Sequence, residues 1–217
     1  MLAHEEQGQE WPLLAWAPGP GVRMVSSAVL GGGVGERAWV LNAQVPPGYG
    51  RLDPVAHLRE LASGAGLEGS GVGLMTAASV ADRRYAADGG TQAVVTAGIG
   101  VRGWAAAPGA GDVVAPRPGT INIIVSLPVP LTDAALVNAV ATATEAKTQA
   151  LVELGADASG TPTDAVCVAA PTPTGAEAEA FAGPRSLWGA RLARAVHRAT
   201  RSACADLLAA ERAGRLR

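Results

Sequence analysis

Lys147 is the single lysine among the 17 Lys and Arg residues of this 217-residue chain. A lysine can lose its proton when it is shielded from water, whereas an arginine in practice cannot. If the surrounding stretch is helical, Lys147 shares one face with five apolar residues: Leu136, Val140, Ala143, Ala150 and Leu154. This placement predicts either a base in apolar surroundings or a lysine whose stem lies along the helix while its ammonium group reaches water.

Hydroxyl side chains gather where predicted strands meet turns rich in Gly or Pro: Ser26, Ser27, Thr76, Thr96, Thr120, Thr161 and Thr163. The loop SGTPTDA, residues 159–165, contains Asp164, an acid at the entry to an apolar run. Loops on a rigid scaffold often carry functional sites, although hydroxyls at strand ends also serve as caps and turn formers. A hydrolase with these residues would work with Ser or Thr, a lysine and carboxylates.

Glu145 is a second candidate acid on the same helix. It lies two positions before Lys147, so the two side chains point about 200° apart on a straight helix. Glu145 falls instead on a polar stripe with Asn138, Thr142 and Gln149. We therefore expect only one of the two to reach a site, and we expect the partner of Lys147 to lie across the fold.

Metal and thiol chemistry receive little support from the sequence. His4, His57 and His197 show no paired spacing and no adjacent cysteine, so we expect no metal site and no Cys–His nucleophile. Cys167 and Cys204 fall in an apolar strand and on a helix, which predicts buried, unreactive thiols.

The glycine-rich stretch GGGVGE, residues 31–36, follows a predicted strand. A dinucleotide-binding loop would open directly into a helix, but here a second strand follows, and no Walker A lysine is present. The stretch therefore predicts a tight turn with positive φ angles, with close approach to a bulky ligand as the functional alternative.

The composition is that of a folded globular protein, with 48% hydrophobic and 17% charged residues. A net charge of −2 and only 4% aromatic residues give no reason to expect a nucleic-acid partner. The first ten residues, MLAHEEQGQE, are acidic and polar rather than like a signal peptide, and no apolar run is long enough to cross a bilayer. These features predict a soluble cytoplasmic protein without a membrane partner. They predict no particular oligomeric state.

The pattern of elements predicts an α+β fold, a layered α/β sandwich with mixed sheets. Residues 1–10 are expected to form a frayed tail, followed by one domain over residues 11–217 with a linker at 172–186. Strands are predicted at 11–16 (an edge), 22–30, 38–45, 71–79, 91–99, 120–127 and 163–171. Helices are predicted from Pro54 to about Ser63, after a cap at Thr132 or Asp133, and at 187–212, where four arginines form a stripe expected to be solvated.

Two segments, residues 22–79 and 91–171, repeat the order β-β-α-β. Three residue pairs share an offset of eighty positions: Asn42 with Asn122, Val45 with Val125, and Asp53 with Asp133. We interpret the segments as degenerate modules related by duplication, which places Asn42 and Asn122 at equivalent strand positions.

Eight short stretches, found in order from about Arg23 to Ala170, resemble the adenosylcobinamide amidohydrolase family. They are SSAVLGGG, LNAQV with the GY and DP that follow it, VGLMTAA, VTAG, AGD, GTINIIV, TEAKTQAL and GTPTDA. The chain departs from the expected pattern at Pro162, where a glycine is expected, and this stiffens the loop that carries Thr163.

The resemblance implies hydrolysis of the amide that joins aminopropanol to the corrin ring, with the corrinoid as substrate and no cofactor or nucleotide required. Lys147 is the expected base, for water or for a hydroxyl such as Ser27 or Thr163, and Asp164 or Glu145 is expected to orient it. Asn42 and Asn122 are expected to donate hydrogen bonds to the oxyanion or to the corrin amides. The expected groove is completed by strand-end hydroxyls and glycine loops: Thr76, Thr96, Thr120, Gly32 and Gly98. Two alternatives remain, a corrinoid-binding module without activity and a Ser/Thr amidase for another amide.

Overall fold

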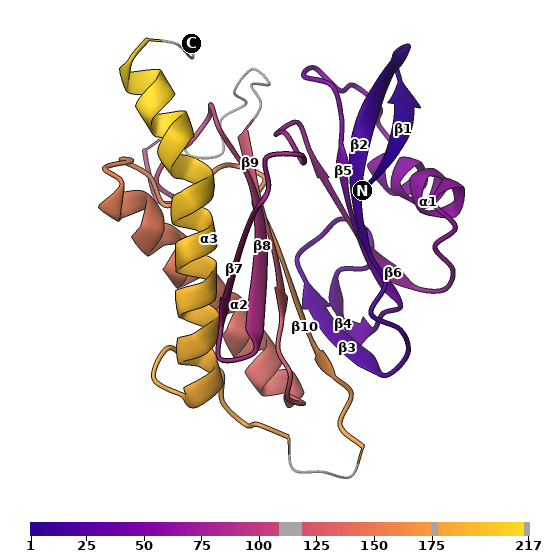
Figure 1. The fold of residues 1–217 in the computed structure, drawn as a ribbon, viewed down its shortest axis with the longest axis vertical. Helices are drawn as coiled ribbons and strands as arrows, with labels where there is room; N and C mark the ends of the chain where they lie inside the picture. The colour runs from indigo at the N-terminus through magenta and orange to yellow at the C-terminus, as the bar shows by residue number, and fades with distance from the viewer. Residues whose placement is uncertain (109–118, 175–177, 215–217) are drawn as a thin grey trace.

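A computed structural model describes residues 1–108, 119–174 and 178–214 of the chain. Four layers follow one another across the molecule: a pair of helices, a six-stranded sheet, a four-stranded sheet and a single helix (Figure 1). Both sheets contain parallel and antiparallel pairs, so the predicted α+β sandwich with mixed sheets is confirmed.

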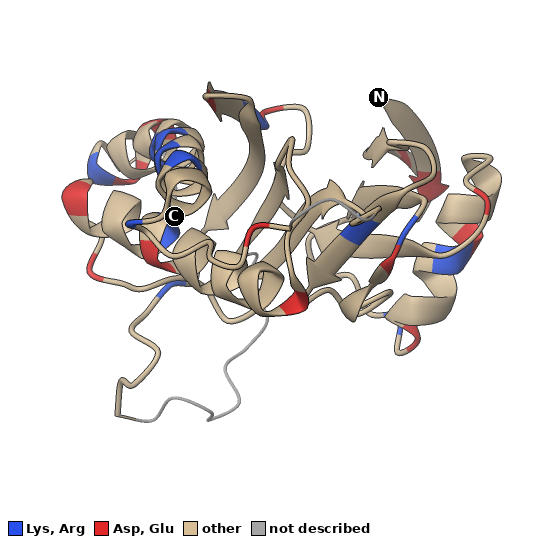
Figure 2. Ribbon diagram, turned by 90° about the horizontal axis from the view of Figure 1, so that it is seen from below, with Lys and Arg blue, Asp and Glu red and all other residues tan. Residues whose placement is uncertain are grey.

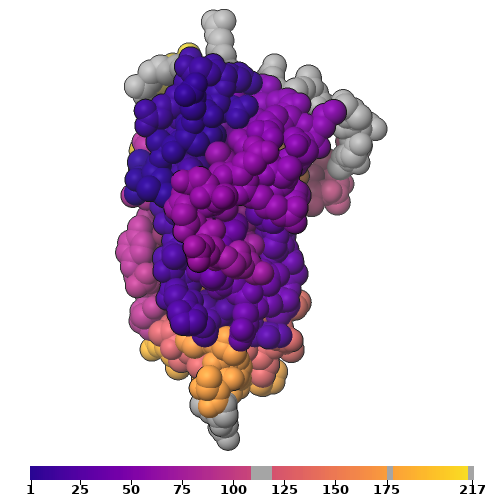
Figure 3. Space-filling view, turned by 90° about the vertical axis from the view of Figure 1, so that its right-hand side faces the viewer, coloured from indigo at the N-terminus to yellow at the C-terminus, as the bar shows by residue number. Residues whose placement is uncertain are grey.

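The four-stranded sheet begins with a hairpin at the N-terminus. Its strands, in spatial order, are β1 (Leu2–Glu6), β2 (Gln9–Trp16), β5 (Trp39–Gln44) and β6 (Gly71–Thr76). The prediction of a frayed tail at residues 1–10 is therefore wrong. Gln7 and Gly8 both have positive φ, 54° and 72°, as a two-residue hairpin turn requires, and strand pairing then orders a polar segment. On the surface, this hairpin lies beside the α1 segment (Figure 3).

The six-stranded sheet has the spatial order β4 (Gly33–Glu36), β3 (Val22–Ser26), β10 (Ala165–Pro171), β9 (Gly119–Ser126), β8 (Thr91–Ile99) and β7 (Arg84–Asp88). Only β9 and β10 run parallel. The stretch GGGVGE belongs to the β3–β4 hairpin, and Gly31 and Gly33 have φ angles of 72° and 82°. The prediction of a glycine turn is thus confirmed.

Helix α1 (Pro54–Gly64) covers the four-stranded sheet, while α2 (Asp133–Glu153) and α3 (Leu187–Arg212) cover the six-stranded sheet. The α2 helix begins after Thr132, whose side chain accepts a hydrogen bond from the Ala135 N–H at 3.1 Å. Asp53 holds the cap position of α1 without a side-chain capping bond, and Pro54 fixes the first turn. No helix in the described part of the chain is long and apolar enough to cross a membrane.

The two halves of the chain share one topology. In each half a hairpin is followed by a strand, a helix and a parallel strand: β1-β2-β5-α1-β6 and β7-β8-β9-α2-β10. The counterpart of β8 is therefore β2, and not the strand at 22–26 as the sequence repeat suggested. That strand forms a hairpin with β4 and joins the edge of the other sheet beside β10. The duplication itself stays a prediction.

Three apolar clusters hold the layers together. The largest lies between the six-stranded sheet and α2 with α3, the second lies between the two sheets, and the third lies under α1. Cys167 and Cys204 are fully buried in the second and the first of these clusters. Burial raises the pKa of both thiols to about 12, so the prediction of unreactive cysteines is confirmed.

The arginine stripe on α3 consists of Arg191, Arg194, Arg198 and Arg201 (Figure 2). Asp88 of β7 accepts hydrogen bonds from Arg194 at 2.9 Å and from Arg198 at 3.1 Å. The Arg194 bond is the main cause that lowers the pKa of Asp88 to about 2. Glu153 of α2 lies 3.2 Å from Arg201. Arg194, Arg198 and Arg201 therefore pair with acids of their own fold, and Arg191 donates to the Gly89 carbonyl oxygen at 3.1 Å, which gives no support for an anionic partner.

Candidate active site

A cleft of about 610 Å³ opens at one end of the two sheets, where β3, β5 and β6 end and β9 and β10 begin. Its polar lining comprises four hydroxyls, an amide, a carboxylate, a guanidinium and a phenol: Ser27, Thr76, Thr120, Thr163, Asn122, Asp164, Arg51 and Tyr49. Val45, Pro46, Leu74 and Met75 contribute apolar surface. Among the lining residues that the structure describes, Asp164 is the single carboxylate, which makes it the main candidate for acid–base chemistry.

Asp164 is held by an ion pair from α2. Its Oδ2 atom lies 2.5 Å from the Lys147 Nζ atom, and the two side chains are only 12% and 9% exposed. Oδ1 accepts the Ile121 N–H at 2.8 Å and the Thr161 hydroxyl, and Oδ2 also accepts the Thr161 N–H at 3.1 Å. Four donors thus occupy the roughly four lone-pair sites of the carboxylate. The expectation of a Lys147 partner across the fold is confirmed.

Lys147 stands behind the cleft. It is not among the residues that line the cleft, although its ammonium group contacts Asp164, which does line it. The lysine therefore fixes the loop that carries Thr163 and Asp164. This arrangement supports a positioning role more directly than the base role expected from the sequence.

Two threonine hydroxyls meet on the cleft wall. Thr120 Oγ1 and Thr163 Oγ1 are 2.6 Å apart, and both lie within hydrogen-bond distance of the Gly119 carbonyl oxygen, at 2.9 and 3.0 Å. Ser27 is exposed at the cleft, and its Oγ accepts the Val166 N–H at 3.0 Å, which leaves its own hydroxyl proton free to donate. Thr163 and Ser27 are thus the exposed hydroxyls available to a substrate.

Asn42 and Asn122 connect the two sheets beneath the cleft. Asn122 Nδ2 donates to Asn42 Oδ1 at 2.9 Å and to the Met75 carbonyl at 3.1 Å, and Asn42 Nδ2 donates to Thr96 Oγ1 at 3.0 Å. Because the Met75 carbonyl can only accept, it fixes the orientation of the Asn122 amide. Asn122 Oδ1 is buried without a hydrogen-bond partner. Both Nδ2 hydrogens of Asn122 are thus used within the protein, which gives no support for its expected role as a donor to substrate.

A family model described as adenosylcobinamide amidohydrolase matches residues 1–211. The chain belongs to this family. It is also similar to a curated Methanosarcina mazei protein named adenosylcobinamide amidohydrolase, with 36% identity over 143 residues, which cover 66% of this chain and 67% of that protein. A crystal structure of a Pyrococcus horikoshii OT3 protein aligns with a TM-score of 0.38 at 13% identity, covering 88% of this chain and 71% of the other.

In this adenosylcobinamide amidohydrolase family member, six residues predicted for the site line the cleft: Ser27, Thr76, Thr120, Asn122, Thr163 and Asp164. Thr163 reaches the wall despite Pro162. Thr76 also accepts the Ala78 N–H at 3.0 Å, so its hydroxyl oxygen already has a structural partner. The AGD stretch at residues 110–112 lies outside the described residues.

The remaining predicted residues lie away from the cleft surface. Asn42 and Thr96 stand behind Asn122 as hydrogen-bond partners. Glu145 is exposed on α2, on a different side of the helix from the buried Lys147. Gly32 and Gly98 do not line the cleft, because both lie in backbone that packs closely against neighbouring residues. The structure therefore corrects the placement of Glu145, Gly32 and Gly98 at the site.

Tyr49, Arg51 and Pro54 line the opposite wall and were missed as site residues. Tyr49 and Arg51 belong to the loop between β5 and α1, and Pro54 is the first residue of α1, so the rule that sites gather in loops at strand ends applies here as well. Arg51 is paired with Glu60 at 3.0 Å and with Asp53 at 3.4 Å. These pairs hold its guanidinium at the rim, where it is the one cation among the lining residues.

Gly160 leaves room for the Lys147–Asp164 pair. A Cβ atom at this position would fall against Asp164 Oδ2 and lie 2.5 Å from Lys147 Nζ. We expect Gly160→Ala to separate the pair, to lower the free energy of unfolding by about 1–3 kcal/mol and to reduce turnover at least about tenfold.

Gly103→Ala is the matched control for Gly160→Ala. Gly103 pairs with Gly160 in an isolated bridge, but a Cβ added to it meets no atom within 4 Å. We therefore expect Gly103→Ala to keep nearly the same free energy of unfolding, measured with urea, and nearly the same turnover as the unmodified protein. Equal losses in the two variants would contradict the steric argument.

Substitution of the two asparagines separates cross-sheet packing from contact with substrate. Asn42→Leu and Asn122→Leu both break the Asn–Asn bond, so each is expected to lower the free energy of unfolding by about 2 kcal/mol. Of the two, only Asn122 lines the cleft, so only Asn122→Leu should also raise KM, by about tenfold, because it alone changes the shape and polarity of the cleft wall. Steady-state kinetics test this difference, and a similar KM in the two variants would contradict it.

Proposed function

We propose that this cleft hydrolyses the amide that links aminopropanol to the corrin ring of adenosylcobinamide, releasing adenosylcobyric acid and aminopropanol. The observation that carries the proposal is the family match over residues 1–211, and family membership indicates a hydrolase that acts on an amide bond. The product acid returns a scavenged corrinoid to cobalamin assembly. No nucleotide is consumed, because hydrolysis of an amide needs only water as the second reactant.

The cleft has groups suited to such a substrate. A corrin is a large flat ring whose edge carries amide side chains, so it requires apolar contact together with a few polar groups. Val45, Pro46 and Leu74 supply apolar surface, and the exposed hydroxyls of Ser27 and Thr163 supply polar groups for a substrate amide. Arg51 at the rim offers a donor for a carbonyl or phosphate oxygen.

The reaction requires a nucleophile and a proton for the leaving amine. In the proposed course, the Thr163 hydroxyl oxygen attacks the amide carbon, and the C–N bond breaks as the hydroxyl proton passes to the amine nitrogen. Water then cleaves the resulting ester and restores the hydroxyl. Asp164 is the proposed acid–base group, and the Thr161 hydroxyl, one of its four donors, can rotate away to release a lone pair. Ser27 is the alternative nucleophile.

The deciding experiment incubates purified protein with adenosylcobinamide and no added nucleotide, and separates the products by chromatography. Equal amounts of adenosylcobyric acid and free aminopropanol support the proposal. A shift of the corrinoid absorption spectrum without product would instead indicate a binding module. Hydrolysis of simpler amides without any corrinoid spectral shift would indicate an amidase for another substrate.

A further inference from the structure

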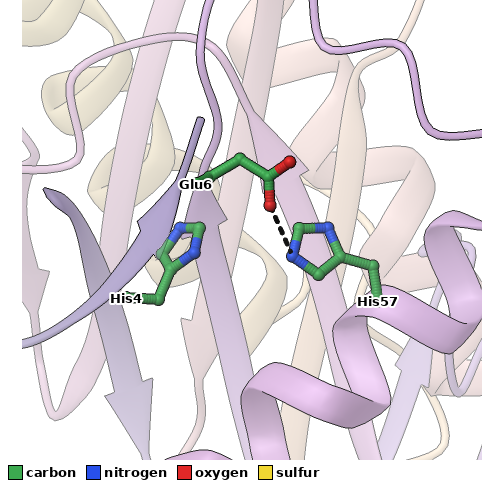
Figure 4. A group of neighbouring side chains, drawn as sticks. All are labelled: His4, Glu6 and His57. Atoms are coloured by element: carbon green, nitrogen blue, oxygen red, sulfur yellow. Dashed lines mark ion pairs between the residues drawn. The ribbon is translucent and has the colours of Figure 1, made fainter. Parts of the chain in front are cut away.

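Three side chains that commonly bind metals face one another between the N-terminal hairpin and α1 (Figure 4). They are His4 and Glu6 of β1 and His57 of α1, and one potential ligand atom from each lies within 4.8 Å of the others. His4 and Glu6 are two residues apart on a strand and so project from the same side of it. His57 is 2% exposed. The histidines that lack paired spacing in the sequence are thus brought together by the fold.

The hydrogen bonds around His4 leave one nitrogen facing the cluster. Its Nε2 lies 2.7 Å from the Gln44 carbonyl oxygen, which can only accept, so the proton is on Nε2. Nδ1 therefore carries a lone pair, and this atom is buried with no hydrogen-bond partner. A metal-binding histidine typically donates its other ring N–H to a carbonyl in this way.

His57 has a similar arrangement. Its Nδ1 lies 2.8 Å from the Tyr49 hydroxyl, and its Nε2 lies 3.3 Å from Glu6 Oε2. Burial is the main cause that lowers the pKa of His57, which favours the neutral imidazole that binds metal. Tyr49 can accept the Nδ1 proton, so Nε2 is free to act as a ligand.

A simple ion pair does not account for all three residues. Contact between His57 and Glu6 would satisfy those two side chains but would leave the buried His4 Nδ1 unpaired. His57 is buried and His4 and Glu6 are partly buried, and two imidazole lone pairs and a carboxylate oxygen that meet in such a place are costly unless a cation or a donor lies between them.

We propose that His4 Nδ1, Glu6 and His57 Nε2 bind a divalent transition-metal ion, with Zn²⁺ as the ion best suited to the donors. Two imidazoles and one carboxylate form a common three-residue zinc set, and the fourth position of the tetrahedron is left for water. Ligand atoms around a tetrahedral zinc are about 3.3 Å apart, so binding would draw the three side chains inward.

The bound ion would fasten the N-terminal hairpin to α1. It would also fix Tyr49, which stacks on His57 with ring centroids 5.6 Å apart and lines the cleft. We assign the ion this structural task and no step in amide hydrolysis. The proposal therefore stands or falls independently of the proposed function.

Binding is tested on the full-length protein after removal of metal with a chelator. Calorimetric titration with ZnCl₂ should show one ion per chain, and Co²⁺ should give the visible absorption of a tetrahedral site. At a Zn²⁺ concentration about 100 times the Kd, the melting temperature should rise by about 5–10 °C. Absence of binding of either ion to the unmodified protein would overturn the proposal.

Variants locate the ion. His4→Gln and Glu6→Gln should each weaken Zn²⁺ binding by at least tenfold and remove most of the thermal shift. His197→Gln is the matched control, because among the described residues His197 has a single carboxylate partner, Glu153, at 2.7 Å, and belongs to no such cluster. Circular dichroism confirms that each variant is folded before titration. Unchanged binding in both cluster variants, or equal loss in the control, would overturn the assignment.

Discussion

Lys147→Met is expected to reduce turnover by about 100-fold or more and to lower the free energy of unfolding by about 3–5 kcal/mol. The substitution removes the partner of a buried carboxylate, and Asp164 then keeps three of its four donors. Loss of the pair also frees the loop that carries Thr163, and small displacements of reacting groups slow a reaction strongly. Urea denaturation and steady-state kinetics measure the two effects.

Arg23→Met provides the control for this prediction. Arg23 pairs with Asp133 at 2.7 Å near the start of α2, the helix that carries Lys147, but the two side chains are 30% and 62% exposed. Exposed ion pairs contribute about 0–1 kcal/mol. We therefore expect Arg23→Met to retain its activity and nearly all of its stability. A similar loss in the two variants would show that burial of the Lys147 pair has no special importance.

The double variant Lys147→Met with Asp164→Asn separates charge from packing. Removal of both charges eliminates the unpaired buried carboxylate, so more than half of the lost stability should return. Turnover should remain low, because the asparagine cannot supply acid–base chemistry at the cleft. Recovery of turnover together with stability would contradict the proposed role of Asp164.

Lys147→Arg tests the geometry of the pair. Gly160 packs so closely against Nζ and the carboxylate that the broader guanidinium has no space in the same position. We expect a loss of turnover close to that of Lys147→Met. Near wild-type turnover would exclude both a base role for Lys147 and a strict geometric requirement.

The long elements of the fold could be predicted from the sequence because local signals agree with their packing. Helix α3 begins and ends where its periodicity predicts, and α2 follows the predicted Thr132 cap. The missed strands β1, β4 and β7 are short and largely exposed, so they show no apolar alternation. They exist because neighbouring strands offer hydrogen-bonding edges, and a local pattern does not encode that pairing.

Several predicted site residues lie at strand ends, and these residues come together in the structure. The rule placed Ser27, Thr120 and Thr163 in one region, and the folded chain brings their loops to one cleft. The strand-end rule did not indicate that Asp164 is the acid that contacts Lys147. That contact forms only when the loop after α2 turns back over the helix. Nor did the rule indicate the approach of His4 to His57, since that contact requires the N-terminal hairpin to pack against α1.

Thr163→Val is expected to reduce kcat on the order of 10³-fold or more, because it removes the proposed nucleophile while keeping the shape of the side chain. Thr163→Ser should retain most of the activity. Ser27→Ala is the matched comparison, since it removes the other exposed hydroxyl of the cleft, and it should reduce kcat by less than about tenfold. The reverse order of effects would exclude Thr163 as the nucleophile.

Mass spectrometry of the trapped enzyme provides a test that is independent of rate. Attack by Thr163 forms an ester between its oxygen and the corrin acid, so brief acid quenching during turnover should leave a corrinoid attached to the peptide that contains residues 161–165. Thr163→Ser should carry the same adduct, whereas Thr163→Val should carry none. If the unmodified enzyme turns over but shows no adduct at any quench time, the Thr163 ester is contradicted and water attacks the amide directly. Asp164 would then be the group that activates the water, since it is the single carboxylate among the described residues of the cleft wall.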